Sequence, residues 1–89
     1  MADSEHFAYL LKCANGSYYA GYTNDLQRRL ATHQAGKASK YTRARLPVEM
    51  VYWQTFATKG EAMSAEARLK TLTHSQKENL VQGFNQILC

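Results

Sequence analysis

The residues from 19 to 33 constrain the fold of this chain more than any other stretch. An aromatic run reaches Gly21, and a helical pattern begins shortly after it, near Asp25. Thr23 and Asn24 both suit the N-cap position, and a carboxylate at Asp25 would meet the positive end of the helix dipole. The stretch therefore predicts a strand that turns directly into a helix.

This helix is expected to span about residues 25–35. Gly36 follows it, and glycine commonly occupies the position just after a helix C-terminus. With about 100° between successive side chains, Leu26 and Leu30 form an apolar stripe along one side. The helix should therefore pack on the sheet through these two leucines.

A cation and an imidazole border the same stripe. Arg29 and His33 are four residues apart, so they lie one above the other, whereas Arg28 points into solvent. Together with Tyr19 at the end of the strand, these groups would suit a phosphate. An alternative is that the stem of Arg29 covers the edge of the core and that His33 is a boundary histidine with satisfied hydrogen bonds.

The first strand is predicted over residues 6–13, because its apolar residues alternate. One face would carry Phe7, Tyr9, Leu11 and Cys13, and the other Ala8, Leu10 and Lys12. The dipeptide Asn15-Gly16 is a strong hairpin signal. The returning strand is expected over residues 18–22, which are rich in aromatic side chains.

A third strand is predicted over residues 48–56, opened by Pro47, where a missing N–H does no harm. Strict alternation would place Val51 and Trp53 on one face. The other face would carry Met50, Tyr52 and Phe56. Both faces are largely apolar, so the strand should be covered on both sides.

Two helices complete the chain. The run from Thr58 to Glu61 fits a capping box and opens a helix over residues 59–72. The run from Ser75 to Glu78 fits a second one and opens a short helix that would end at Gly83. A C-terminal tail would then pack back on the core through Phe84, Ile87 and Leu88. The predicted fold is α+β: a three-stranded antiparallel sheet flanked by helices in the order β-β-α-β-α-α.

The segment from 36 to 45 is expected to be a loop, and it is the densest positive cluster in the chain. The cluster comprises Lys37, Lys40, Arg43 and Arg45. Tyr41 sits among these residues and could stack on a nucleobase. A net charge of +4 permits binding to a polyanion without demonstrating it. The alternative is an ordinary solvated loop.

Glu66 falls among the apolar positions of the second predicted helix. These positions are Ala62, Ala65, Leu69 and Leu72. A carboxylate in such a stripe is costly unless it is paired, hydrogen-bonded or bound to a metal. Glu66 is therefore expected to be paired, with Arg29 as the candidate partner, to be hydrogen-bonded, or to bind a metal.

Composition and length exclude several classes of protein. A chain of 89 residues predicts a single domain over residues 1–89. No run of about 18 apolar residues suggests a membrane span, and the acidic N-terminus lacks the core of a signal peptide. We therefore expect a cytoplasmic protein. Cys13 and Cys89 have no CxxC spacing, so a zinc site is not expected and both should be reduced thiols.

Two short motifs give the chain a family resemblance. Residues 8–10 (Ala-Tyr-Leu) and 19–21 (Tyr-Ala-Gly) resemble the two halves of the GIY-YIG nuclease motif, of which the tyrosines and the glycine remain. Arg29 follows Tyr19 by ten residues and His33 by four more, as in that family, and Glu66 occupies the place of its metal-binding glutamate. The chain is most similar to small stand-alone bacterial GIY-YIG proteins, which resemble the nuclease domain of structure-specific repair endonucleases.

The resemblance implies a metal-dependent endonuclease that hydrolyses DNA, and RNA is not distinguished from DNA. Glu66 would hold one Mg²⁺ or Mn²⁺ ion, and Arg29 would stabilise charge on the phosphate. Tyr9 or Tyr19 would orient or deprotonate the attacking water, which requires a tyrosine pKa shifted down from about 10. His33 would donate to the phosphate or relay a proton. Specificity would come from the basic segment, from DNA shape or from a protein partner.

The chain also departs from the family. Tyr22 stands where many relatives carry a lysine after the glycine, and Asn79 is near the place of a late asparagine without a secure alignment. The competing interpretation is a nucleic-acid-binding or repair-adaptor module with a degenerate nuclease site.

The two motif tyrosines also predict the geometry of the hairpin. Tyr9 and Tyr19 reach one site only if they share a face of the sheet. That parity requires a three-residue loop, Ala14-Asn15-Gly16, with Gly16 in the left-handed conformation. Cys13 would then face Ser17, Leu11 would face Tyr19, and Tyr9 would face Gly21.

Overall fold

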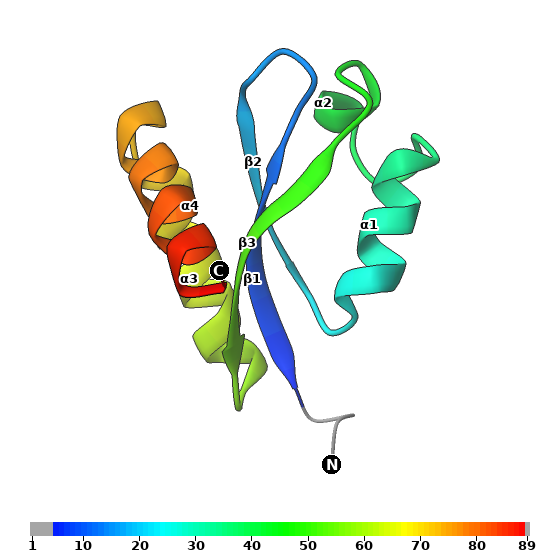
Figure 1. The fold of residues 1–89 in the computed structure, drawn as a ribbon. Helices are drawn as coiled ribbons and strands as arrows, with labels where there is room; N and C mark the ends of the chain where they lie inside the picture. The colour runs from blue at the N-terminus through cyan, green and yellow to red at the C-terminus, as the bar shows by residue number, and fades with distance from the viewer. Residues whose placement is uncertain (1–4, 89) are drawn as a thin grey trace.

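A computed structural model describes the backbone of residues 5–88 and the side chains of residues 5–84. The central strand β1 (His6–Lys12) pairs antiparallel with β2 (Tyr18–Thr23) on one side and with β3 (Glu49–Phe56) on the other. The sheet separates two helical layers (Figure 1). Helices α1 (Leu26–Gln34) and α2 (Lys40–Arg43) lie on one face, and α3 (Lys59–Thr71) and α4 (His74–Leu88) on the other.

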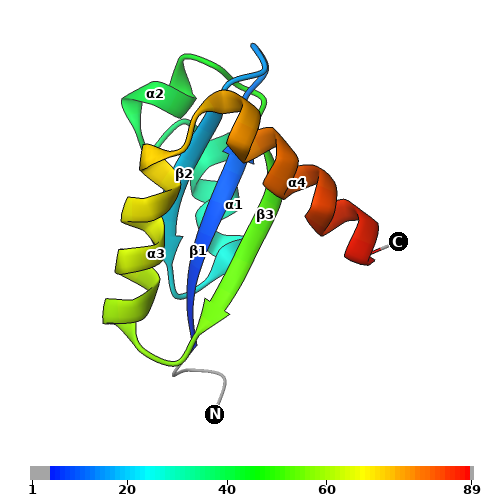
Figure 2. The same ribbon diagram turned by 90° about the vertical axis from the view of Figure 1, so that its left-hand side faces the viewer.

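The α+β class, the sheet and the order β-β-α-β-α-α are confirmed, with α2 as an additional short helix. Figure 2 shows the sheet from the side of α3 and α4, with β1 between its neighbours and α4 running obliquely along β3.

No helix within residues 5–88 is long and apolar enough to cross a membrane.

The alternation of side chains along β1 builds two separate cores, as the sequence predicts. Ala8 and Leu10 pack under α3 and α4, together with Ala65, Leu69 and Val81. Tyr9, Leu11 and Cys13 face α1, where Leu26 and Leu30 pack against them. Cys13 is a buried free thiol. The stripe of Leu26 and Leu30 therefore has the predicted role.

The hairpin between β1 and β2 has the predicted three-residue loop. The N–H of Cys13 donates to the carbonyl of Ser17 at 2.8 Å, and Gly16 has a φ of +87°. Tyr9 pairs with Gly21 and Leu11 with Tyr19. The two motif tyrosines consequently share the face of the sheet that is covered by α1.

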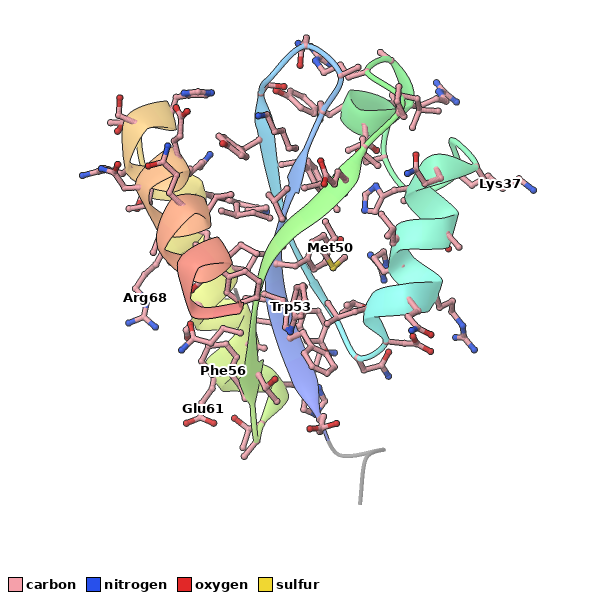
Figure 3. All side chains as sticks on the ribbon, viewed as in Figure 1. Lys37, Met50, Trp53, Phe56, Glu61 and Arg68 are labelled. Carbon is pink, nitrogen blue, oxygen red and sulfur yellow. The ribbon has the colours of Figure 1, made fainter. Side chains whose placement is uncertain are left out.

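The predicted alternation along β3 is wrong at its start, because the strand carries a β-bulge. The register shifts between Leu10 and Leu11, so Leu10 pairs with Tyr52 but Leu11 pairs with Met50. Met50 therefore joins Trp53 on the α1 side, while Val51 packs on the α3 side with Tyr52 and Phe56. Figure 3 shows Met50 and Trp53 pointing toward α1 and Phe56 pointing away from it.

The start of α1 differs from the prediction by one residue. Asp25 is the N-cap itself, because its side chain accepts a hydrogen bond from the N–H of Arg28 at 3.0 Å. Thr23 supports this cap by accepting from the N–H of Asp25. Gly36 follows the helix with a φ of +75°, which confirms the predicted end.

Helix α2 interrupts the segment that the sequence predicts as a loop. Ser39 is its N-cap, and the Ser39 Oγ accepts from the N–H of Thr42 at 3.1 Å. The helix is a single turn, too short to show an apolar period in the sequence.

The capping box of α3 is confirmed, since Thr58 and Glu61 exchange hydrogen bonds. The box predicted at Ser75 is wrong: Thr73 and Gln76 form the box, and α4 starts at His74.

Gly83 does not end α4 but lies inside it, with no positive φ. A glycine within a helix costs about 1 kcal/mol relative to alanine. The next residue offsets that cost, because Phe84 stacks edge-on against Tyr52 and Trp53 with centroid distances of 5.3 and 4.7 Å. The predicted tail is therefore helical up to Leu88, whereas the packing expected of Ile87 and Leu88 and the state of Cys89 lie outside the described residues.

Candidate active site

The hydroxyl of Tyr9 is the centre of the candidate site. Tyr9 is fully buried on β1, and its hydroxyl lies 3.0 Å from Nε2 of His33 on α1. The neighbouring strand leaves room for the ring, since a Cβ built at Gly21 would overlap the Tyr9 hydroxyl. Gly21, the glycine of the second motif, therefore leaves the space on β2 that the Tyr9 phenol occupies.

The imidazole of His33 is held from both sides. Its exposure is 1%, and Nδ1 lies 2.9 Å from Oγ1 of Thr42, which is itself fully buried on α2. The ring of Tyr19 meets it edge-on at a centroid distance of 5.3 Å. Both ring nitrogens therefore have protein partners, an arrangement that suits proton relay better than direct donation to a phosphate.

Arg29 brings a positive charge to this hydrogen-bonded pair. Its guanidinium lowers the pKa of both Tyr9 and His33, so it lies within electrostatic range of both groups. Arg29 itself is exposed and can meet a phosphate from solvent. Arg28 is exposed too but influences neither pKa, as the helical phase predicts.

Burial dominates the acid–base properties of the site. Burial raises the pKa of Tyr9, the Arg29 guanidinium partly offsets this rise, and the charges of Tyr19 and Glu66 reinforce it. The resulting pKa is about 12. Burial and Arg29 together lower the pKa of His33, so the imidazole is neutral near pH 7. The protein alone therefore does not give Tyr9 the lowered pKa expected of a tyrosine base.

Glu66 approaches the site from the other side of the sheet. It lies on α3, which packs on β1 and on the edge strand β2. Its charge raises the pKa of Tyr9, so the carboxylate is within electrostatic range of the phenol. The ion pair with Arg29 is not formed; Glu66 pairs instead with Lys70 at 3.4 Å, and 21% of its side chain is exposed.

The donor set suits a cation that keeps most of its water. Within residues 5–88, no group of three or more His, Cys, Asp or Glu side chains converges on a point. A single accessible carboxylate fits Mg²⁺ or Mn²⁺, since such ions are commonly held by one or two carboxylates, water and substrate phosphates. Glu66 is the side chain that would hold it.

The basic segment divides into two groups of side chains. Lys37, Lys40 and Arg43 line a hollow of about 380 Å³ together with Ser39, and no acidic residue lines it. Lys37 extends into solvent at the end of α1 (Figure 3). Arg45 belongs elsewhere, because its guanidinium covers the ring of Tyr41 at 3.8 Å and donates to the Tyr41 carbonyl.

Tyr41 links the basic segment to the candidate site. Its ring stacks on Tyr19 with a centroid distance of 6.0 Å, and 38% of the residue is exposed. Because Arg45 lies over the ring, the surface offered to a nucleobase would include the guanidinium as well as the tyrosine.

The residues at which the chain departs from the family lie apart from Tyr9. The hydroxyl of Tyr22 is 3.0 Å from Nδ1 of His6, so a tyrosine–histidine pair stands in place of the lysine. Asn79 lines an apolar groove between α4 and β3. Since β3 is the edge strand opposite β2, Asn79 is not part of the site.

Thr42 contacts His33 and Ser39 contacts Thr42, and neither was predicted from the sequence as a candidate site residue. Residues 40–43 carry positive charge and resemble the corresponding stretch of the small bacterial relatives, but neither signal gives the Thr42 hydroxyl a role. Thr42 contacts His33 only because α2 folds onto the end of α1.

Comparison with known proteins finds a matching family and several relatives of this chain. The GIY-YIG catalytic domain family matches residues 5–79. A UPF0213 protein of Bacillus pumilus is 57% identical over 92% of this chain and 84% of its own length. A UPF0213 protein of Halobacterium salinarum is 49% identical, covering 84% of this chain and 97% of the relative.

Two solved structures also match. The solution NMR structure of a UPF0213 protein from Bacillus halodurans is 45% identical, with a TM-score of 0.56 over 88% of this chain and 83% of that one. The solution NMR structure of a protein from E. faecalis is 43% identical, with a TM-score of 0.60 over 92% and 88%.

Proposed function

The chain belongs to the GIY-YIG catalytic domain family, and from this we propose that it is a metal-dependent endonuclease that hydrolyses phosphodiester bonds in DNA. We propose further that it acts on structured DNA during repair or processing. One observation carries the proposal: the buried Tyr9 phenol is hydrogen-bonded to a neutral imidazole, and an arginine and a carboxylate lie within electrostatic range of the phenol.

Each residue has a role that its surroundings support. Arg29 is exposed beside the buried pair and would stabilise the charge that develops on the phosphate. Glu66 would hold Mg²⁺ or Mn²⁺, which would supply Lewis-acid stabilisation of the phosphate oxygens. Tyr9 and Tyr19 would contact the attacking water, and His33 would receive a proton through Tyr9. The hollow lined by Lys37, Lys40 and Arg43 would contact the flanking phosphates, beside the pair of Tyr41 and Arg45.

The test is a nicking assay with Mn²⁺ on supercoiled plasmid and on branched DNA. Glu66→Gln removes the charge but keeps the shape, and we expect it to abolish cleavage without lowering Tm. Glu61→Gln on the same helix is the matched control, because glutamine also suits a capping box. Cleavage by Glu66→Gln at the wild-type rate would refute the assigned site.

A second function is a nucleic-acid-binding module with a degenerate site. Two observations favour it: Tyr22 stands in place of the lysine, and the pKa of Tyr9 is raised rather than lowered. In that case the wild type and Glu66→Gln would bind branched DNA equally and neither would cut it. The same assay, run beside a binding measurement, therefore separates the two functions, and a parallel RNA substrate distinguishes the nucleic acid.

A further inference from the structure

Thr42 and Ser39 form a hydrogen-bonded chain behind His33. The Thr42 Oγ1 lies 2.9 Å from Nδ1 of His33, 3.2 Å from the Ser39 Oγ and 3.4 Å from the Ser39 carbonyl. On the other side of the ring, Nε2 faces the Tyr9 hydroxyl at 3.0 Å. Hydrogen bonds thus connect three buried side chains in the order Tyr9, His33, Thr42.

Of the two possible tautomers of His33, only one gives every proton in this hydrogen-bonded series an acceptor. If Thr42 donated to Nδ1, Nε2 would carry the proton and donate to the oxygen of Tyr9. The phenol proton would then have no acceptor among these groups. If Nδ1–H instead donates to Thr42, the Thr42 hydroxyl donates toward Ser39 and the Tyr9 hydroxyl donates to Nε2, so every proton has an acceptor.

We propose that Thr42 is a positioning residue that holds His33 as the Nδ1–H tautomer, with the Nε2 lone pair directed at the Tyr9 hydroxyl. Because a buried polar group without a partner is costly, the Thr42 oxygen that accepts from Nδ1–H and the Tyr9 proton that needs Nε2 together make this tautomer the stable one. The assignment of the tautomer stands on the geometry alone, whereas its consequence for cleavage rests on the proposed function.

The consequence is a proton relay that avoids a free tyrosinate. As the water oxygen bonds to phosphorus, a water proton moves to the Tyr9 oxygen and the original phenol proton moves to Nε2. The phosphodiester P–O bond breaks, and the leaving oxygen keeps its electron pair and takes a proton from solvent. Tyr9 stays neutral throughout, and the imidazolium later returns its proton through the same hydroxyl.

The first measurement is the ¹⁵N spectrum of the histidine rings at neutral pH, with His33→Gln used to assign the His33 signals. We expect a protonated Nδ1 and an unprotonated Nε2 in the wild type. A predominant Nε2–H tautomer would overturn the proposal, and this readout needs neither a metal nor cleavage activity.

The second measurement uses three variants. Thr42→Val keeps the shape but removes the acceptor, and we expect His33 to shift toward the Nε2–H tautomer and kcat to fall at least tenfold with KM little changed. Thr42→Ser should restore both. Thr32→Val removes a hydroxyl that donates to the Arg28 carbonyl and should change neither.

Three outcomes separate the inferences. An unchanged tautomer in a folded Thr42→Val would overturn the proposal whatever the rate. A shifted tautomer with full activity would overturn the relay. The Nδ1–H tautomer in a wild type that cuts no substrate would uphold the role of Thr42 and refute the proposed nuclease function instead.

Discussion

The hydroxyl of Tyr9 lies 3.0 Å from Nε2 of His33, a residue 24 positions later in the chain. This bond joins the middle strand of the sheet to α1 beside the apolar cluster that includes Leu11, Leu26 and Leu30. A buried polar pair of this kind is stable only while both groups remain satisfied. The packing that places α1 on the sheet therefore also fixes the geometry of the candidate site.

Adjacent arginines on α1 should differ in effect. Arg29 acts electrostatically on Tyr9 and His33, and Arg28 does not. We expect Arg29→Ala to lower the cleavage rate by about 100-fold or more, the usual cost of losing one charge-stabilising donor. Arg28→Ala should change the rate within about twofold, as for other surface charges. Equal losses in the nicking assay would contradict the assigned orientation of α1.

Gly21 should tolerate no side chain. A Cβ there would overlap the Tyr9 hydroxyl, whereas nothing lies within 4 Å of a Cβ at Gly60. We expect Gly21→Ala to displace the Tyr9 ring, to cost about 1–3 kcal/mol of stability as overpacking does, and to abolish cleavage. Gly60→Ala on α3 should stabilise by up to about 1 kcal/mol and keep full activity. Thermal melts of the two variants check this, and an active Gly21→Ala of wild-type Tm would contradict the close approach.

The sequence predicted local features well, because local physics decides them. The hairpin loop follows from Asn15-Gly16 and the parity of Tyr9 and Tyr19, and the structure has it. The capping box at Thr58 and the glycine after α1 are likewise short-range signals. These are the elements in which each residue's preference agrees with its neighbours'.

The sequence-based predictions were wrong or incomplete where contacts between residues far apart in the chain determine the structure. The bulge in β3 depends on the register with β1, and alternation within the strand does not show it. Gly83 stays helical because Phe84 packs on Trp53. Thr42 enters the site because α2 folds against α1. The pairing of Glu66 with Lys70 rather than Arg29 follows from the sheet that separates α3 from α1.

The basic hollow should dominate the salt dependence of DNA binding. Each contact with a duplex phosphate contributes about 0.9 to the slope of log Kobs against log salt, so a triple Lys37→Gln, Lys40→Gln, Arg43→Gln variant should reduce that slope by about 2.7. The matched control removes three charges from α3 and α4 through Lys59→Gln, Arg68→Gln and Lys77→Gln. Figure 3 shows Arg68 and Lys37 on opposite sides of the molecule. Equal slope changes would show that binding follows net charge rather than this surface.

The loss of folding stability at acid pH should depend in part on the protonation of His33. Its ring contacts Tyr9 from β1, Tyr19 from β2 and Thr42 from α2, and burial together with the nearby charge of Arg29 on α1 lowers its pKa. An unfolded histidine titrates near pKa ~6.5, so below that pH the unfolded state binds the extra proton and folding is penalised. The stability that neutral His33 supports is thus fully present above pH ~6.5 and is lost as the pH falls through its lowered folded pKa.

Two measurements check this. Between about pH 7.5 and pH 5, the wild type should lose more Tm than His33→Gln. If the relay operates, the cleavage rate should decline over the same acid range, because a protonated Nε2 cannot accept the proton of Tyr9. An NMR titration of His33 gives the pKa directly even if His33→Gln folds poorly. A His33 pKa at or above about 6.5, the value of an unfolded histidine, would contradict both expectations, since neither burial nor Arg29 would then be holding the imidazole neutral.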